Sequence, residues 1–471
     1  MQDAVVVGAG PNGLAAAVAI AEQGFEVTVL EARDTIGGGT RTTTEALPGL
    51  LVDECSAVHP LGIASPFLSS LPLGDHGLQW AWPEVGLAHP LDGGRAAVLH
   101  RSLDDTVAEL GDDGEPWRRR FEPLVAEHAA LLDEVLRPPV HVPRAPLTLG
   151  RFGVAALRSV EDLVGRWSTD EARALFAGVA AHAMQPLHRP LTAAVGLVLG
   201  AAGHAGGWPV AVGGSAAITA ALASLLTSLG GTIRTGVTVR RLADLPRTRV
   251  ALFDTTPGAL VAIAGDAMPA RVRRSLERYR HGPAAYKVDL AVDGGVPWTS
   301  SACRRAGTVH VGGTLEEIAA AERDIHAGRM PERPFVLVAQ QYLADPTRSQ
   351  GDVHPVWAYA HVPYGWAGDA TDALIDQVER FAPGLRERIV GVHVRTPADL
   401  ERDNANHVGG DISAGANSPG QVLFRPRVAT DPYATGIPGV FLCSAATPPG
   451  AGVHGMCGAN AAASALRALR H

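Results

Sequence analysis

The strongest constraint on the fold is a glycine-rich turn near the start of the chain, which lies between an apolar strand pattern and an apolar helix pattern. Ala4 to Val7 precede Gly8-Ala9-Gly10-Pro11-Asn12-Gly13, Leu14 to Gln23 follow it, and a second strand pattern covers Val27 to Leu30. Glycines at this spacing permit a tight turn, close approach of a pyrophosphate to the helix N-terminus, and tight helix–strand packing. The opening therefore predicts the βαβ unit of a Rossmann-like, dinucleotide-binding fold.

Glu31 stands directly after the second predicted strand, where a carboxylate can hold the ribose hydroxyls of a dinucleotide. Gly37 to Arg41 then form a second glycine cluster that ends in an arginine. This cluster has two interpretations: it lies along the pyrophosphate and carries Arg41 towards it, or it is an ordinary loop. The glycine fingerprint by itself does not distinguish NAD from FAD.

Composition narrows the classes of protein and of binding partner that remain possible. A chain of 471 residues exceeds the size at which one hydrophobic core stops growing, so two domains are expected. The net charge of −8 gives no reason to expect a nucleic-acid partner. The four cysteines lack the spacing of a zinc knuckle or a redox dithiol, so no metal site is predicted. Without a signal peptide or a spanning pattern, we expect a cytoplasmic protein whose only membrane contact would be peripheral.

Hydrophobic patterning predicts an α/β fold assembled from discontinuous segments. A largely helical block spans 102–203, and strand patterns return at 232–242 and 249–254. The stretch 284–400 mixes strands and helices, as an antiparallel substrate domain would. The region 439–470 again has the order strand, glycine loop and helix.

These motifs resemble those of the FAD-dependent amine oxidase and phytoene desaturase superfamily, and more closely its phytoene desaturase-like flavoproteins, which include carotenoid desaturases and isomerases. The resemblance runs along nearly the whole chain. It is carried by the N-terminal V-V-G-A-G-P-N-G-L and V-L-E-A-R-D-T-I-G-G, by P-V-A-V-G-G-S from Pro209, by K-V-D-L-A-V from Lys287, and by G-V-F-L-C-S-A-A-T-P-P-G-A-G-V-H-G from Gly439. It implies one FAD molecule, bound non-covalently.

The resemblance also implies roles for individual residues. Glu31 would bind the adenosine ribose, while Arg33 and Arg41 would lie near the ribose and the pyrophosphate. Val239 would support the adenine through its backbone, and the segment Gly452-Val453 would lie beside the flavin pyrimidine ring.

The FAD-binding set predicted in this way draws on both ends of the chain. It comprises Gly8, Gly10, Pro11, Asn12, Gly13, Glu31, Ala32, Arg33, Gly38, Gly39, Thr40, Arg41, Val239, Ser444, Ala445, Gly452 and Val453. Two positions depart from the family pattern. Ser444 stands where many relatives have glycine, and Arg41 comes later than the arginine of the commoner G-G-R, so the detailed contacts of both are open.

Three residues are candidates for a catalytic role: His59, Lys287 and His454. Some flavin oxidases place a lysine near the flavin N5 through a water, which is the precedent for Lys287. The alternation around Lys287 equally predicts a strand with one solvated face. His454 is either a neighbour of the isoalloxazine that tunes it or a residue packed behind its loop. For all three, a purely structural role is the alternative.

The predicted architecture pairs a FAD-binding domain of residues 1–70, 205–260 and 400–471 with a substrate domain of residues 71–204 and 261–399. The predicted reaction is hydride removal from a C–H bond of a mainly apolar organic substrate by a desaturase, dehydrogenase or oxidase. No second G-x-G-x-x-G of comparable quality appears, so oxygen or a quinone is the expected electron acceptor. A flavin-dependent isomerase or reductase, and a non-catalytic flavin-binding protein, are the alternatives.

The proline-rich segment Pro138 to Leu157 carries many apolar residues and few charges. It has two interpretations: a surface that docks on a membrane to collect an apolar substrate, or a lid or domain-packing loop.

Overall fold

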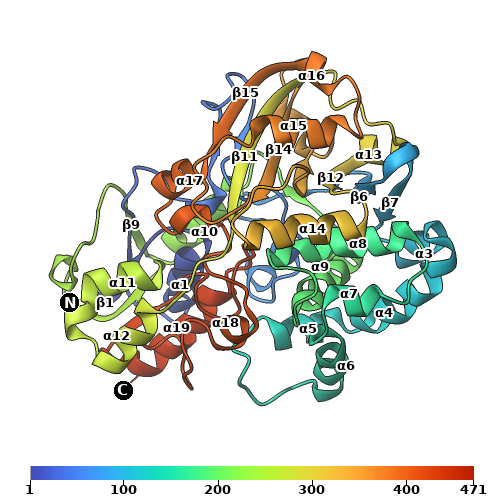
Figure 1. Ribbon diagram of the computed structural model, residues 1–471. Helices are drawn as coiled ribbons and strands as arrows, with labels where there is room; N and C mark the ends of the chain where they lie inside the picture. Colours follow the sequence, from blue (N-terminus) through green and yellow to red (C-terminus); the bar gives the residue numbers. More distant parts are fainter. Residues whose placement is uncertain (1, 471) are drawn as a thin grey trace.

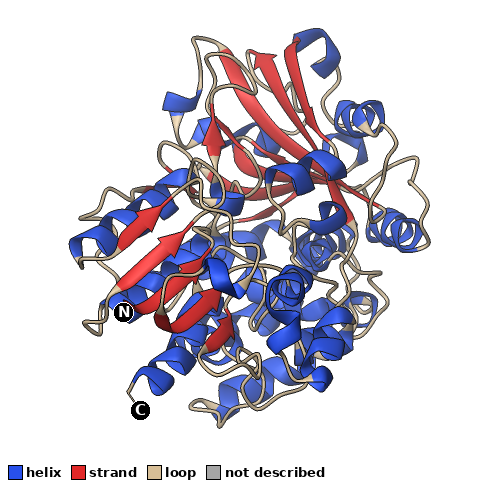
Figure 2. Cartoon of the chain, turned by 90° about the vertical axis from the view of Figure 1, so that its left-hand side faces the viewer, coloured by secondary structure: helices blue, strands red, loops and turns tan. Residues whose placement is uncertain are grey.

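The N-terminal strand lies at the centre of a five-stranded parallel sheet. The computed structural model describes residues 2–470, and the strand order of this sheet is β16-β10-β1-β2-β9. The strands are β1 (Gln2–Val7), β2 (Val27–Leu30), β9 (Thr232–Arg234), β10 (Thr248–Phe253) and β16 (Val440–Leu442). Segments from the beginning, the middle and the end of the chain therefore share one sheet, which is the lower group of strands in Figure 2.

Both faces of this sheet are buried, as is usual for parallel sheets. Ala4 and Val6 pack into the core on one face, and Val5 and Val7 pack into the core on the other. The covering helices are α1 (Pro11–Ala21), α10 (Ala216–Ser228) and α19 (Met456–Leu469) on the first face, and α11 (Pro257–Ala264) and α12 (Ala270–Glu277) on the second. The four consecutive apolar residues Ala4 to Val7 therefore suit a central strand that is covered on both faces.

A second sheet has seven strands in the order β15-β11-β14-β13-β12-β6-β7, and all its pairs are antiparallel except β12 with β6. The strands are β6 (Val85–Pro90), β7 (Ala96–Leu99), β11 (Ala284–Asp293), β12 (Ala306–Val311), β13 (Val336–Ala339), β14 (Val353–Val362) and β15 (Ile389–Arg395). One face packs against α15 (Thr371–Glu379). The other face packs against α14 (Leu315–His326) and a layer of helices.

That helical layer lies below the seven-stranded sheet on the right of Figure 1. Its helices are α3 (Leu103–Glu109), α4 (Gly114–Ala126), α5 (His128–Val135), α6 (Pro146–Ala156), α7 (Val160–Val164), α8 (Asp170–Ala180) and α9 (Thr192–Gly206). Helix α9 lies at the centre of the layer. Its glycines allow aromatic rings of the neighbouring helices to approach its backbone closely. A Cβ added at Gly200 would lie 2.5 Å from the ring of Phe121.

The α/β fold class predicted from the sequence is confirmed, and one predicted strand is too long. The pattern at 232–242 predicted a single strand, whereas β9 ends at Arg234. Gly236 has a φ of 69°, and the Val237 N–H donates to the Glu31 carbonyl at 2.8 Å. The chain therefore turns across the end of β2 instead of continuing along it. Within residues 2–470, no helix has both the length and the apolar composition to cross a membrane.

The contact between α1 and α19 yields a stability prediction. A Cβ added at Gly458 would lie 1.9 Å from the Asn12 carbonyl oxygen, so Gly458→Ala must push the two helices apart. We expect the substitution to lower the free energy of unfolding by about 1–3 kcal/mol or more. Gly153→Ala in α6 is the matched control, because no atom lies within 4 Å of the added methyl group, and it should be neutral or slightly stabilising. Equal unfolding midpoints for the two variants would contradict the close packing.

Candidate functional site

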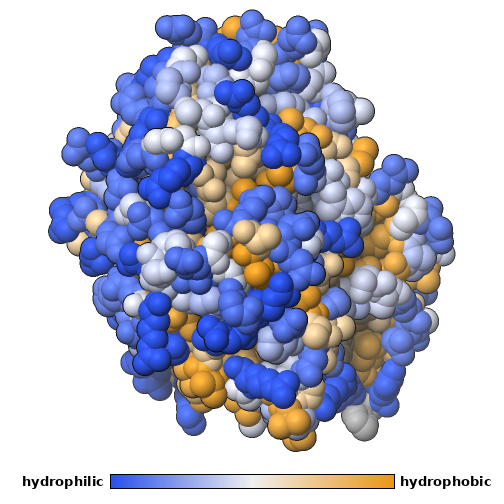
Figure 3. Space-filling model, turned by 90° about the vertical axis from the view of Figure 1, so that its right-hand side faces the viewer, coloured by the Kyte–Doolittle hydropathy of each residue, from blue (hydrophilic) through white to orange (hydrophobic). Residues whose placement is uncertain are grey.

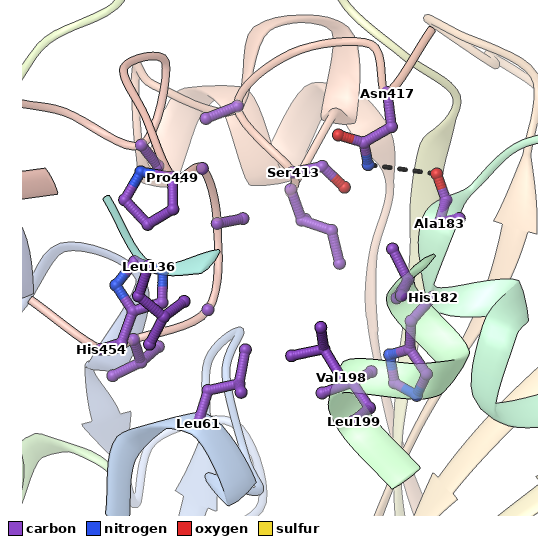
Figure 4. A pocket seen from close by; sticks show the side chains of 18 of the residues that line it. Leu61, Leu136, His182, Ala183, Val198, Leu199, Ser413, Asn417, Pro449 and His454 are labelled. Atoms are coloured by element: carbon purple, nitrogen blue, oxygen red, sulfur yellow. Dashed lines mark hydrogen bonds between the residues drawn. The ribbon is translucent and has the colours of Figure 1, made fainter. Parts of the chain in front are cut away.

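One cavity of about 720 Å³ connects the glycine-rich turn with the helical layer and the seven-stranded sheet. Its polar end is lined by Gly10 to Asn12 and Gly38 to Thr40. Its apolar end is lined by side chains that include Leu61, Leu136 and Val198, which Figure 4 shows around the central space. A single continuous space thus joins the predicted dinucleotide site to an apolar chamber.

Steric contacts explain each glycine of the first turn. Gly8 has a φ of 103°, and a Cβ added at Gly13 would lie 2.1 Å from the Gly8 carbonyl oxygen. A Cβ added at Gly10 would lie 2.8 Å from a carboxylate oxygen of Asp254. Helix α1 begins at Pro11 with no side-chain cap. The helix dipole there favours an anion such as a phosphate, and the Gly13 N–H of this first turn is bonded to Asp254.

Glu31 connects the two glycine clusters. Its carboxylate accepts hydrogen bonds from the Ala9 N–H at 2.8 Å and from the Arg33 N–H at 2.9 Å, and Arg41 lies 3.5 Å away. Arg41 also donates to the Thr35 carbonyl at 2.9 Å. The Glu31 carboxylate thereby holds the glycine turn and the second cluster together at the end of β2.

Asp254 is a site residue that the sequence did not single out. It follows β10 directly, lines the cavity, and accepts a hydrogen bond from the Gly13 N–H at 2.9 Å. Burial raises the pKa of Asp254 to about 7. The sequence holds a signal for this residue, because it stands at the carboxyl end of a buried strand, where the ligands of open α/β sheets bind.

The loop 450–455 forms a wall of the cavity and has an unusual backbone. Gly450 and Gly452 have φ values of 118° and 147°, and Val453 has a φ of 50°, which is rare for a β-branched residue. His454 is folded back on this loop: its Nδ1 accepts a hydrogen bond from the Met456 N–H at 3.1 Å. Burial lowers the pKa of His454 to about 4, so the ring is neutral at physiological pH. The structure therefore places His454 at the start of α19, where it caps an N–H of the helix.

The other two catalytic candidates lie outside the cavity wall. His59 is buried and its Nε2 lies 2.8 Å from the Ser215 hydroxyl. Lys287 is buried within β11, where it forms an ion pair with Asp289 and lies 5.7 Å from the ring of Trp357, a residue of the wall. Burial lowers the pKa of the Lys287 ammonium, although Asp289 opposes that shift.

The predicted FAD-binding residues divide into two groups. Those that line the cavity are Gly10, Pro11, Asn12, Gly38, Gly39, Thr40, Ser444, Ala445, Gly452 and Val453. Those that do not line it are Gly8, Gly13, Glu31, Ala32, Arg33, Arg41 and Val239. Of the second group, Val239 packs in the apolar core beside Leu30, while the side chain of Arg33 is exposed.

Arg425 is a second wall residue without an assigned role in the sequence. It is 2% exposed, and no carboxylate of residues 2–470 lies within ion-pairing distance of it. Its guanidinium donates to the Asn417 side chain at 2.7 Å and to the Ala445 carbonyl at 3.3 Å. A buried, unpaired positive charge is costly, so this end of the cavity is suited to an anionic group.

The polar end of the cavity fits the pyrophosphate of a dinucleotide. The N-terminus of α1 supplies positive potential there, and the Arg425 guanidinium lines the same cavity. Asn12 lines the same space, and its side-chain amide can donate an N–H to a phosphate oxygen. A glycine cradle that any Cβ would fill completes the fit.

Comparison with known proteins agrees with this geometry. Residues 6–65 match the family model described as an NAD(P)-binding Rossmann-like domain. Pyridine nucleotide-disulfide oxidoreductase domain-containing protein 2 of Rattus norvegicus is 26% identical to the chain, with 100% of this chain and 94% of the relative covered. The lycopene-forming phytoene desaturase of Pseudescherichia vulneris is 25% identical, with 99% of each chain covered.

The solved structures show the same fold. Wild-type putrescine oxidase bound to putrescine superimposes with a TM-score of 0.62 at 18% identity, and the match covers 99% of both chains. These similarities confirm the resemblance to amine oxidases and phytoene desaturases that the sequence motifs carry, and they support an oxidoreductase function. The amine oxidases and phytoene desaturases among its relatives are FAD-dependent, in agreement with the cofactor that the resemblance implies.

The buried Asp254 predicts a specific pH dependence of stability. Its folded pKa of about 7 lies above the ordinary value of 3.8, so its contribution is complete below about pH 4 and is lost as pH rises through 7. A tenfold difference in proton affinity between the folded and unfolded states corresponds to about 1.4 kcal/mol. Wild type should therefore lose more unfolding free energy between pH 5 and pH 8 than Asp254→Asn, which keeps an acceptor for Gly13. Thermal unfolding at both pH values measures this, and identical pH differences in the two proteins would refute it.

Proposed function

We propose that the chain is a FAD-dependent oxidoreductase that removes a hydride from a C–H bond of a mainly apolar organic substrate. The observation that carries this proposal is the continuity of one cavity from the glycine-rich turn to an apolar chamber. A flavin held by its phosphates at the polar end would reach the chamber without leaving the protein. Chambers of this size, mainly apolar with a few placed polar groups, are typical of small-molecule sites.

The residues proposed to hold FAD are those of the predicted set that line the cavity, with Asp254 and Arg425 added. The start of α1 and Arg425 would bind the pyrophosphate. Glu31 does not line the cavity, and we add it to this set as the proposed ligand of the adenosine ribose. When bound, the flavin supplies the hydride-accepting chemistry. We further propose that residues 1–70, 205–260 and 400–471 form the FAD-binding domain, because all five strands of the parallel sheet come from them.

The chain's own contribution is binding, orientation and exclusion of water. Side chains of α5, α6 and α9 enclose the apolar end, among them Val135, Phe152 and Val198. An apolar wall excludes water and leaves shape as the main recognition of the substrate. The loop 450–455 shapes the wall between the two ends, and its backbone is held by the cap that His454 makes on α19.

A mainly apolar substrate is favoured over a diamine by the charges of the wall. Its carboxylates include Glu134, which bonds His141 at 2.5 Å and the N–H groups of Arg144 and Ala145. Because both of its carboxylate oxygens already accept these hydrogen bonds, Glu134 has little remaining capacity to bind an ammonium group of a substrate. The alternatives of an isomerase or reductase, and of a non-catalytic flavin-binding protein, are distinguished by the experiment that follows.

The purified protein should be yellow and release FAD, rather than FMN, on denaturation. Gly13→Leu should lose the flavin, because its side chain cannot fit beside the Gly8 carbonyl. Under anaerobic conditions, a desaturase, dehydrogenase or oxidase should show bleaching of the flavin by terpenoid or alicyclic substrates. Product formation without net bleaching would instead indicate an isomerase, and a protein that cannot be loaded with FAD would overturn the proposal.

An exposed apolar surface on the helical layer supports a peripheral membrane contact. Figure 3 shows apolar patches along the lower part of the face that it views. In the proline-rich segment the exposed apolar side chains are Val140, Val142, Leu147, Val154 and Leu157, all more than 60% exposed. Neighbouring side chains of the same segment, Leu149 and Phe152, line the cavity, so this surface adjoins the apolar chamber.

We expect replacement of Val142, Leu147 and Val154 by serine to reduce flotation of the protein with liposomes of anionic lipid. Each exposed side chain contributes about 1.5–3 kcal/mol when fully buried, so the loss should be several-fold even for partial insertion. Val390→Ser, at an exposed site on β15, is the matched control. Equal flotation of the triple variant and wild type would assign the segment to the lid or domain-packing role.

A further inference from the structure

The seven-stranded sheet forms one wall of the cavity, and five of its side chains line that wall. They are Thr308 on β12, Leu337 and Ala339 on β13, and Trp357 and Tyr359 on β14. Leu337 is the cross-strand neighbour of Tyr359, and Ala339 is that of Trp357, so these side chains share one face of the sheet. The polar atoms of this wall decide which substrate groups it can recognise.

Tyr359 differs from the two other polar side chains of the sheet wall. Thr308 Oγ1 and Trp357 Nε1 are sealed inside the protein. Tyr359 is only 6% exposed, and its hydroxyl has no hydrogen-bond partner within residues 2–470, yet the hydroxyl oxygen is not sealed. Because Tyr359 lines the cavity, this hydroxyl opens into it.

The titratable neighbours of Tyr359 on the same face are bonded to one another. Lys287, its cross-strand neighbour on β11, forms the ion pair with Asp289. His361, two residues further along β14, bonds the Glu322 carboxylate at 2.5 Å. The Tyr359 hydroxyl takes part in neither pair, so it remains free for a molecule in the cavity.

Polar side chains from another part of the wall have partners within the protein. The Asn417 amide donates to the Ala183 carbonyl at 3.1 Å, a bond that Figure 4 shows, and it accepts from Arg425 at 2.7 Å. The Ser413 hydroxyl donates to the Met184 sulfur at 3.2 Å. This amide and this hydroxyl are therefore already engaged in holding the wall together.

A buried tyrosine hydroxyl without a partner is costly, because a hydroxyl group that leaves water loses free energy unless another hydrogen bond replaces the lost one. Phenylalanine would fill nearly the same volume without that cost. A partner that enters the cavity therefore explains a tyrosine here. Burial raises the pKa of the Tyr359 phenol above its ordinary value, and the nearby Cys55 and Glu322 add to the shift. The phenol thus keeps its proton and can donate it in a hydrogen bond.

We propose that the Tyr359 hydroxyl donates a hydrogen bond to a carbonyl oxygen of the substrate. The ring of Trp357 meets the ring of Tyr359 edge-on, with the centroids 5.1 Å apart at an interplanar angle of 85°, which restricts the orientation of the phenol. This inference rests on the proposed function, because it takes the cavity as the substrate site.

The surroundings of the hydroxyl favour an uncharged acceptor. A carboxylate at this wall would lie against the apolar side chains of Leu337 and Ala339, while the nearby Lys287 ammonium is already paired. A carbonyl oxygen needs one donor and brings no net charge. The substrate class is therefore a mainly apolar molecule that carries a carbonyl group.

The hydrogen bond is tested with decan-2-one and 2-methyldec-1-ene, two molecules of nearly the same shape in which C=O is replaced by C=CH₂. Calorimetric titration gives the affinity of the FAD-loaded protein for each. The ratio of the two affinities is the measured quantity, because the ketone also loses more hydration than the alkene on binding. We expect the ketone-to-alkene ratio to be about fivefold to thirtyfold higher in wild type than in Tyr359→Phe. Equal ratios would refute the proposal and would leave water as the partner of the hydroxyl.

Infrared spectroscopy of decan-2-one labelled with ¹³C at the carbonyl gives a second measure that does not depend on affinity. A hydrogen bond to the oxygen weakens the C=O bond. The stretching frequency of the bound ketone should therefore be lower in wild type than in Tyr359→Phe. The same frequency in the two proteins would contradict the proposed bond.

Tyr286→Phe is the matched control. Tyr286 belongs to β11 of the same sheet, but it packs on the face that α15 covers, and its hydroxyl donates to Asp369 at 2.8 Å. This variant should keep both the affinity ratio and the carbonyl frequency of wild type. A fall in its ratio as large as that of Tyr359→Phe would show that the effect is not specific to the cavity hydroxyl and would overturn the assignment.

Failure of this hydrogen bond is distinguishable from failure of the proposed function. Retention of FAD by Tyr359→Phe shows that the variant is folded. A flavin that no substrate reduces would refute the oxidoreductase proposal, whereas the binding of the ketone and the alkene is measured without turnover.

Discussion

The close approach of Gly13 to the Gly8 carbonyl oxygen is the contact on which the rest of the structure depends. It allows α1 to start directly at the end of β1, with the Gly13 N–H bonded to Asp254 at the end of β10. The other side of α1 receives Gly458 of α19 at a similarly short distance. Two strands and two helices from the beginning, the middle and the end of the chain thus meet at one point. The polar end of the cavity is the space that this junction leaves open.

Those parts of the site that come from one short stretch of chain are predictable from the sequence, because the residue pattern that indicates each of them is contiguous. The glycine turn, the strand patterns around it and the final strand–loop–helix each place residues of the cavity wall within a short stretch of chain. Asp254 and Arg425 were not predicted, because their roles depend on distant partners. Asp254 lies 241 residues from the Gly13 N–H that it accepts. Only the pairing of β10 with β1 brings them together.

The same limit applies to the seven-stranded sheet. Nothing in the sequence indicates that β6 pairs with β12 in parallel register. The sequence also offered His59 and Lys287 as catalytic candidates, and neither lines the cavity. Lys287 was a catalytic candidate because of the resemblance. Its ion pair with Asp289 lies inside the sheet because β11 is buried on both faces, and that burial depends on residues far away in the sequence. The outline of the FAD site therefore follows from sequence, whereas the substrate end does not.

The two ends of the cavity differ in the titratable side chains that line them. The polar end contains Asp254, and burial is the largest of the causes that raise its pKa to about 7. A bound pyrophosphate would raise it further, since a nearby negative charge favours the protonated carboxyl group. Protonation there would leave Arg425 and the N-terminus of α1 to face the phosphates, with Asp254 as a neutral acceptor for Gly13. At the apolar end, burial lowers the pKa of His182 to about 3, so this ring is neutral, and the carboxylate of Glu134 is bonded to His141. Burial thus has the same physical effect at both ends, because it favours the uncharged form of Asp254 and of His182. One end is then suited to an anion, and the other is suited to a molecule with little charge.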